Sequence, residues 1–270
     1  MSKRILFPLS VLLLSLLQAC GGDGGGASPA ASNQSAPAVA PPAAADIGNV
    51  SSKFVANDYM RAMLIAPSLQ SGTRDKDFEQ ADSGAVVRLG STSLSGAHQT
   101  VDIAGDVHFA LGRWVRGTVS HTTGSTTLDG KDTDSYHYLA YNGLAELPNA
   151  GELQCTIQAA TAPTALFDNN AKVGSVSGNA RISFDDDGAD IKGTLQVSAG
   201  AESATLNLDY DLNDPTGIFS KGQLYGSGPG TAVGLADQGN AVPGLVVWYR
   251  AQLPGGSLYN GVARLTCSNL

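Results

Sequence analysis

Apolar and polar side chains alternate along the second half of the chain. In residues 176–184 the apolar positions are Val176, Ala180, Ile182 and Phe184, with Ser, Asn and Arg residues between them. A period of two is typical of a β-strand with one buried face. The same alternation occurs in residues 152–159, 189–197, 204–212, 245–253 and 259–267, and two further strand-like segments lie at 136–141 and 219–225. The pattern predicts about eight strands from residue 136 to the end.

Short turns between these segments favour antiparallel pairing. Asp185-Asp186-Asp187-Gly188, for example, has the composition of a hairpin turn. Strands that each have one apolar face favour a closed eight-stranded barrel, because closure removes the exposed edges of a sheet. We therefore predict an all-β fold in which residues 133–270 form an antiparallel barrel. A β-sandwich is the alternative.

The first half of the chain is also strand-like, but its alternation is weaker. Strand segments are expected at 85–89, 101–103, 107–111 and 114–120, in a region rich in Ser, Thr and Gly. Residues 47–132 are therefore predicted to form a smaller β-rich handle subdomain. Residues 54–69 are the exception, since they predict one short helix that ends before Pro67.

The amino terminus has the layout of a secretory signal. Lys3 and Arg4 precede an almost wholly apolar run, residues 5–17, and Ala19 and Cys20 follow it closely. The run is too short to cross a bilayer core of about 30 Å as a helix. A small residue directly before a cysteine resembles the lipobox of bacterial lipoproteins. The resemblance implies that residues 1–19 are removed and that Cys20 is acylated and anchored in a membrane. An ordinary secreted protein is the alternative.

A low-complexity stretch follows the predicted anchor. Residues 20–46 consist mostly of Gly, Ala, Ser and Pro with almost no large side chains. Such a segment cannot bury enough surface to fold, so we predict a flexible tether with a reach of roughly 30 Å. Gly21 follows Cys20, whereas Asp at this position retains enterobacterial lipoproteins in the inner membrane. The resemblance implies an outer-membrane location.

Composition narrows the range of partners. The chain has 16 Lys and Arg against 24 Asp and Glu, and its formal net charge is −8. Loss of Lys3 and Arg4 with the signal would bring the charge to −10. Contacts to phosphates need clustered basic residues, so we predict no nucleic-acid partner. After Cys20 no apolar stretch approaches transmembrane length.

Two cysteines remain beyond the predicted anchor. Cys155 and Cys267 lie on the apolar faces of their predicted strands. Export places them in an oxidising compartment, where an even pair of cysteines is expected to form a disulfide. Two separate buried thiols are the alternative.

Several short motifs resemble a known group of proteins. Residues 178–184 (GNARISF) and 191–195 (IKGTL) are similar to a G-x-A-x-x-x-F hairpin and its following strand, and residues 222–226 (GQLYG) resemble a G-x-F-Y-G strand with Leu224 in place of Phe. Together with the lipobox, tether, handle and barrel, they resemble the surface lipoproteins related to transferrin-binding protein B. That group includes factor H-binding protein, haemophilin-type haem carriers and NilC. The resemblance implies export to the cell surface by a dedicated outer-membrane translocator.

Three common sequence motifs of catalysis and metal binding are absent. The chain lacks G-x-S-x-G, H-E-x-x-H and paired-cysteine metal spacing. The acids of residues 185–187 are interpreted as solvated turn residues. Asp209, Asp211 and Asn213 mimic the start of a calcium loop, but Asp214 stands where the loop needs Gly. We therefore predict neither an enzyme nor a metal site.

The histidines are clustered. All four, His98, His108, His121 and His137, lie in a segment that also contains Trp114, Tyr136, Tyr138 and Tyr141. Imidazole is a common axial ligand of haem iron, and aromatic rings pack against porphyrins. Haemophilin-type relatives hold haem through their handle, so the resemblance implies a haem hypothesis. His108 and His137 are preferred as ligands because their neighbours are apolar and aromatic, and solvent-facing histidines are the alternative.

Trp248 is the candidate for a protein contact. It lies on the polar face of its predicted strand, between Val246 and Arg250, and would point outward from a barrel. An exposed Trp beside Arg has the composition of an interface anchor. The alternative is that the handle covers it.

These observations together predict a binding lipoprotein of the Gram-negative outer membrane, displayed at the cell surface. By the resemblance, it would capture a host protein or a nutrient carrier such as haem or haemoglobin. A periplasm-facing structural envelope lipoprotein is the alternative. Exposure at the cell surface would distinguish the binding lipoprotein from the structural one.

Overall fold

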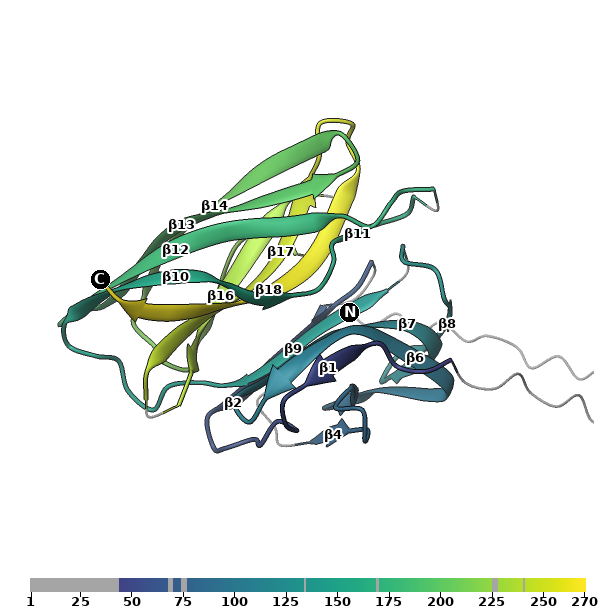
Figure 1. Ribbon diagram of the computed structural model, residues 1–270, viewed down its shortest axis with the longest axis horizontal. Helices are drawn as coiled ribbons and strands as arrows, with labels where there is room; N and C mark the ends of the chain where they lie inside the picture. The colour runs from purple at the N-terminus through teal and green to yellow at the C-terminus, as the bar shows by residue number, and fades with distance from the viewer. Residues whose placement is uncertain are drawn as a thin grey trace, which may run out of the picture. The chain divides into compact units, whose positions relative to one another are not determined.

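The computed structural model describes residues 44–67, 70–73, 77–133, 135–168, 170–224, 228–239 and 241–270. The regular secondary structure of these residues consists of eighteen strands in two nine-stranded sheets (Figure 1). The predicted all-β class is confirmed. Within the same residues there is no helix long and apolar enough to cross a membrane.

The first nine strands make one sheet, here called the N-terminal sheet. Its order is β3-β2-β9-β7-β6-β5-β4, with β1 parallel to β6 and β8 paired with β7. The strands are β1 Gly48–Val50, β2 Met60–Ile65, β3 Gln70–Thr73, β4 Phe78–Gln80, β5 Val86–Leu89, β6 Thr92–Asp106, β7 Phe109–His121, β8 Gly124–Asp129 and β9 Tyr136–Asn142.

The remaining strands make the predicted eight-stranded antiparallel barrel. Its order is β14-β13-β12-β10-β18-β17-β16-β15, and the short β11 pairs with β18. The strands are β10 Gly151–Ala160, β11 Thr164–Ala165, β12 Ser175–Asp185, β13 Gly188–Ala199, β14 Glu202–Leu212, β15 Ile218–Gly222, β16 Gly230–Asp237, β17 Pro243–Gln252 and β18 Leu258–Asn269.

The barrel is nearly closed, and side-chain contacts connect β14, at one end of the sheet, with β15 and β16 at the other end. From β14, the Tyr210 hydroxyl donates to the carbonyl of Thr231 on β16 at 2.8 Å. From β15, the Lys221 ammonium donates to the carbonyl of Asp209 and lies 5.0 Å from the centre of the Tyr210 ring. These contacts cover part of the strand edge that an open sheet would expose.

The alternating positions read from the sequence form the barrel core. On β12, Ala180, Ile182 and Phe184 are buried while the residues between them are more exposed. The core also contains Leu153, Ile191, Leu195, Val197, Leu208, Leu212, Leu245, Val247, Tyr249 and Leu265. Because successive side chains on a strand point to opposite faces, this register fixes which residues turn outward.

The predicted disulfide between Cys155 and Cys267 is confirmed. The two residues lie directly opposite each other on neighbouring strands, β10 and β18. The bond therefore links two adjacent strands and does not cross the core. The bond links positions 112 residues apart. It therefore joins the first strand of the barrel to the last.

An apolar layer packs the N-terminal sheet against the barrel. The N-terminal sheet contributes Met63, Ile65, Phe109, Leu111, Leu139 and Tyr141, and the barrel contributes Leu224, Ala232, Ala236, Val246, Trp248 and Val262. The other face of the N-terminal sheet has its own core, which includes Phe54, Leu64, Trp114, Val119 and Tyr138. The strands between these two cores are buried on both faces, which explains their weak alternation.

Two expectations from the sequence are wrong. Within residues 54–69, the segment Met60–Ile65 is strand β2, which pairs with β3 and β9. The strand expected at residues 136–141 exists as β9, but it pairs with β2 and β7 in the N-terminal sheet and is no part of the barrel. Both strands are buried on two faces, so neither shows the apolar–polar alternation of a one-sided strand. Without that alternation, the sequence does not distinguish a strand from a helix at β2, or show to which sheet β9 belongs.

Candidate binding surface

His137 is fully buried, and both of its ring nitrogens are bonded to threonines. Nδ1 lies 2.8 Å from the Thr161 hydroxyl, and Nε2 lies 2.7 Å from the Thr164 hydroxyl. Burial, together with the positive charge of Arg113, lowers the pKa of His137 well below 6.5. The ring is therefore neutral at pH 7, with one nitrogen donating and the other accepting.

This geometry bears on the haem hypothesis. Iron would have to displace a threonine from His137 inside the protein. His108, in contrast, lies in the turn between β6 and β7, and it is half-buried, as are His98 and His121. Haem binding therefore stays a prediction, and His108 is its more accessible candidate.

The aromatic residues near the histidines are part of the core. Trp114 is buried and donates its indole N–H to the carbonyl of Val86 at 2.6 Å. Its ring lies 6.3 Å from that of Tyr136 and 5.9 Å from that of Tyr138. These rings pack against each other, so their clustering in the sequence is explained by the fold.

Trp248 faces outward from the barrel as predicted, but it is not exposed, and the alternative that the handle covers it is what the structure shows. The N-terminal sheet covers its side chain completely. Its indole N–H donates to the carbonyl of Met63 at 3.2 Å. Trp248 is a packing residue between the sheets.

Four apolar side chains on three neighbouring loops are exposed. They are Val55, Tyr59, Val107 and Val242, with exposed fractions of 63%, 40%, 42% and 42%. We call them the three-loop patch. The Val55 amide donates to the carbonyl of Val107, which joins the first two loops.

Asn142, at the end of β9, organises the first two of these loops. Its side-chain amide donates to the carbonyl of Val55, and its side-chain oxygen accepts from the amide of Asn57. Its backbone amide donates to the carbonyl of His108. A buried asparagine with these bonds fixes the loop backbones and leaves the valines outside.

The third loop reaches the same place through His108. A Cβ atom added to Gly239, in the turn between β16 and β17, would lie 3.0 Å from Nε2 of His108. The Val242 amide donates to the carbonyl of Gly239, which closes the turn. His108, predicted as a ligand, therefore lies beside the three-loop patch.

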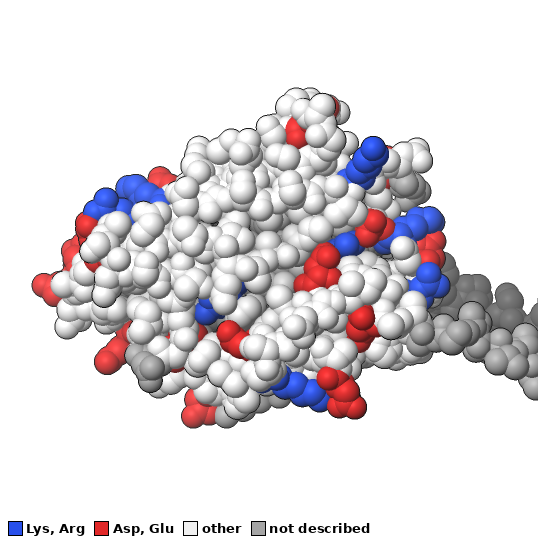
Figure 2. Space-filling view, in the orientation of Figure 1, with Lys and Arg blue, Asp and Glu red and all other residues white. Residues whose placement is uncertain are grey.

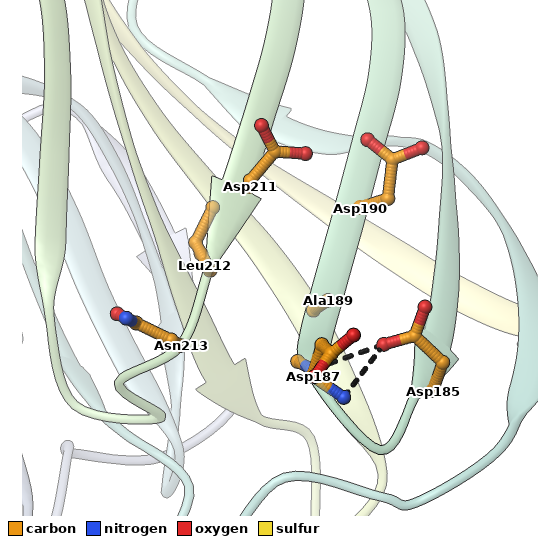
Figure 3. Close-up of a pocket in the computed structure, with 8 residues that line it drawn as sticks. Asp185, Asp187, Ala189, Asp190, Asp211, Leu212 and Asn213 are labelled. Atoms are coloured by element: carbon orange, nitrogen blue, oxygen red, sulfur yellow. Dashed lines mark hydrogen bonds between the residues drawn. The ribbon is translucent and has the colours of Figure 1, made fainter.

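An acidic cleft at the tip of the β12–β13 hairpin is the other candidate (Figure 3). Its volume is about 300 Å³, and its lining includes Asp185, Asp187, Asp190, Asp211, Leu212 and Asn213. The Asp185 carboxylate accepts from the amides of Asp187 and Gly188 at 2.9 and 3.1 Å, which is the role of a turn residue. The part of the chain that the structure describes has no group of three His, Cys, Asp or Glu placed to hold a metal.

Charged groups are sparse in the middle of one molecular face. In Figure 2, Lys, Arg, Asp and Glu lie mostly around the margin of the view, and acidic and basic groups are mixed. Among the described residues, Arg181 is paired with Glu152, and Lys192 is paired with Asp190 and Asp209. On this face there is no continuous basic track of the kind that follows a phosphate backbone.

Sequence reasoning missed the three-loop patch. Val107 was expected inside a strand, and Val55 and Tyr59 inside a helix. An exposed valine on a loop has no periodicity to distinguish it from a core valine. The predicted acylation site, Cys20, lies outside the described residues.

Comparison with known protein families, with curated proteins and with solved structures finds no match to this chain. The resemblance to lipoproteins related to transferrin-binding protein B thus depends on the motifs quoted above.

Proposed function

We propose that this protein is a lipid-anchored binding protein of the outer membrane, displayed at the cell surface, and that it captures a host protein or a protein that carries a nutrient such as haem. The observation that carries the proposal is the three-loop patch. Exposed apolar side chains, one of them a tyrosine, lie on neighbouring loops whose backbone is held by hydrogen bonds. Rigid apolar groups of this kind serve as anchors in protein interfaces.

The surrounding structure suits this role. The two sheets and the disulfide form a rigid scaffold, and function commonly lies on loops that such a scaffold positions. The lipobox and the Gly- and Ala-rich tether support attachment to a membrane with freedom to reach outward. Display by an outer-membrane translocator belongs to the same proposal.

The test of the binding proposal compares three versions of the mature protein in capture from host serum and mucosal fluid. We expect Val55→Asp/Val107→Asp to lose at least tenfold in retention of the captured protein, because charge at an apolar anchor leaves unpaired carboxylates at the interface. Ile47→Asp is the control, since Ile47 is 58% exposed and outside the patch. Equal capture by all three would contradict the role of the patch.

The location is tested separately on intact cells. Surface display predicts that added protease removes the protein while a periplasmic marker survives. Cys20→Ala should lose labelling by radioactive palmitate. Full protection from protease would favour the alternative of a periplasm-facing structural lipoprotein.

A further inference from the structure

A short connector lies at the junction of the two sheets. Residues 161–163 lead from β10 to β11, and four hydrogen bonds tie the connector and the first residue of β11 to the N-terminal sheet. These bonds are His137 to Thr161 at 2.8 Å, His137 to Thr164 at 2.7 Å, Ser135 to Thr164 at 3.0 Å, and the Ala162 amide to the Asp102 carboxylate at 3.0 Å. We call this set the clamp.

The other side of the connector is bonded to the barrel. The Thr161 amide donates to the carbonyl of Val262 on β18, and the Thr161 hydroxyl accepts from the Val262 amide. The Gly174 amide donates to the carbonyl of Pro163. The connector is therefore held between the sheets, and His137 makes two of the four bonds on the side of the N-terminal sheet.

The backbone of strand β6 is irregular at Asp102, whose carboxylate belongs to the clamp. Its φ of 56° lies in the left-handed region, which non-glycine residues rarely adopt, and the pairing of β6 with β7 shifts register there. This backbone conformation places one carboxylate oxygen of Asp102 where it accepts from both the Ala162 amide and Nε of Arg113. Strain retained at a polar contact is a common sign of a functional constraint.

The charges around His137 disfavour a second positive group. Arg113, directly opposite His137 on β7, is bonded to Asp102 at 2.9 Å and to Asp132 at 2.5 Å, so both carboxylates contact its guanidinium. On the barrel face that bears Trp248, the charged residues packed toward this layer are Arg250 on β17 and Arg264 on β18. An imidazolium at this position would be buried beside the guanidinium of Arg113, which disfavours its charge.

We propose that the clamp is an acid-sensitive latch between the two sheets, in which proton uptake by His137 releases the connector and loosens the N-terminal sheet from the barrel. Both ring nitrogens of the cation are donors, so the threonine hydroxyl that donates to the neutral ring has to rotate and accept instead, and hydration of the buried charge requires water to enter the junction. The inference is independent of what the protein binds.

The sign of the effect follows from the lowered pKa of His137. In the unfolded chain the imidazole has its ordinary pKa, near 6.5, so above that pH both states are neutral and the clamp is at full strength. Below pH 6.5, His137 binds a proton in the unfolded or opened state but not in the closed state. Stability is lost progressively as pH falls toward the pKa of the closed state.

The test measures hydrogen exchange of the mature protein at pH 7 and pH 5, each corrected for the intrinsic exchange rate. We expect the connector amide of Ala162, which donates to Asp102 across the junction, to lose at least tenfold in protection at pH 5, while core amides of β12 and β13 keep theirs. His137→Gln cannot take up a proton and should show the same protection at both pH values. His98→Gln, on β6 and outside the clamp, should behave as the wild type.

Two results would overturn the latch. One is equal protection of the connector amide of the wild type at pH 7 and pH 5. The other is a pH-dependent loss that persists in His137→Gln. If that variant does not fold, the ring resonances of His137 in the wild type are titrated by NMR, and a midpoint that differs from that of the loss of protection rejects the idea.

Discussion

Phe167 is exposed and has an unfavourable backbone conformation. Its φ is 62°, and 73% of its surface is accessible. The loop around it is anchored, since the Leu166 amide donates to the carbonyl of Leu258 and the Tyr259 hydroxyl donates to the carbonyl of Lys172. The phenyl ring therefore gains little from the fold, although the backbone strain costs on the order of 1–3 kcal/mol.

This strain leads to a prediction for stability. Replacement Phe167→Gly should raise the free energy of unfolding by about 1 kcal/mol, because glycine adopts positive φ without steric cost. Urea unfolding of the mature protein measures the change. Phe167→Ala is the control, and it should give no gain since alanine keeps the steric penalty. A loss of stability in the glycine variant would show that the ring packs against the fold.

At the scale of elements, glycines make room for tyrosines on neighbouring strands. A Cβ atom at Gly112 on β7 would lie 2.3 Å from the hydroxyl of Tyr138, its partner on β9. A Cβ atom at Gly261 on β18 would lie 2.2 Å from the hydroxyl of Tyr249, its partner on β17. The absence of a side chain on one strand lets a large ring from the next strand lie flat across it.

The glycine–tyrosine contacts can be tested by a single methyl group. Gly261→Ala should lower the free energy of unfolding by about 1–3 kcal/mol, because the ring of Tyr249 must leave its position in a packed core. Gly72→Ala is a suitable control, since its added Cβ would meet only the Ala62 carbonyl at 3.6 Å. Chemical denaturation compares the two. Equal stability of both variants would mean that Tyr249 moves without cost.

At the scale of the whole molecule, one covalent bond encloses the barrel. The Cys155–Cys267 disulfide joins β10 to β18, and strands β12 to β17 lie within the 112-residue separation. A cross-link of this kind restricts the unfolded chain more than the folded one. Chain-entropy accounting gives about 4–5 kcal/mol for a loop of this size, as an upper estimate.

Removal of the disulfide should therefore weaken the whole fold. The double variant Cys155→Ala/Cys267→Ala is expected to lose up to about 4 kcal/mol in free energy of unfolding. Dithiothreitol should destabilise the wild type by a similar amount and leave the double variant unchanged. A wild type that is insensitive to reductant in its unfolding midpoint would contradict this prediction.

The molecule also shows how much of a site the sequence can predict. The pairing of Cys155 with Cys267 was predicted from the expected oxidising compartment and the even number of cysteines. The outer-face position of Trp248 was predicted from the alternation of apolar and polar residues. The sequence did not indicate that a second sheet would cover Trp248, because the covering residues, such as Met63, are distant in the chain. The contacts of His137 with Thr161 and Thr164 are likewise unpredictable from local pattern.

The sequence by itself determined the strands of the barrel, their inward and outward faces and the cysteine partners. The strands and their faces depend on the alternation of apolar and polar residues that are neighbours in the sequence. The cysteine pairing depends on the even number of cysteines beyond the predicted anchor. Only the tertiary structure decided that β9 joins the N-terminal sheet, that Trp248 is buried, and that three loops bring apolar residues together at the surface. Such outcomes depend on which sheet face meets which, and that choice is made by packing between distant segments.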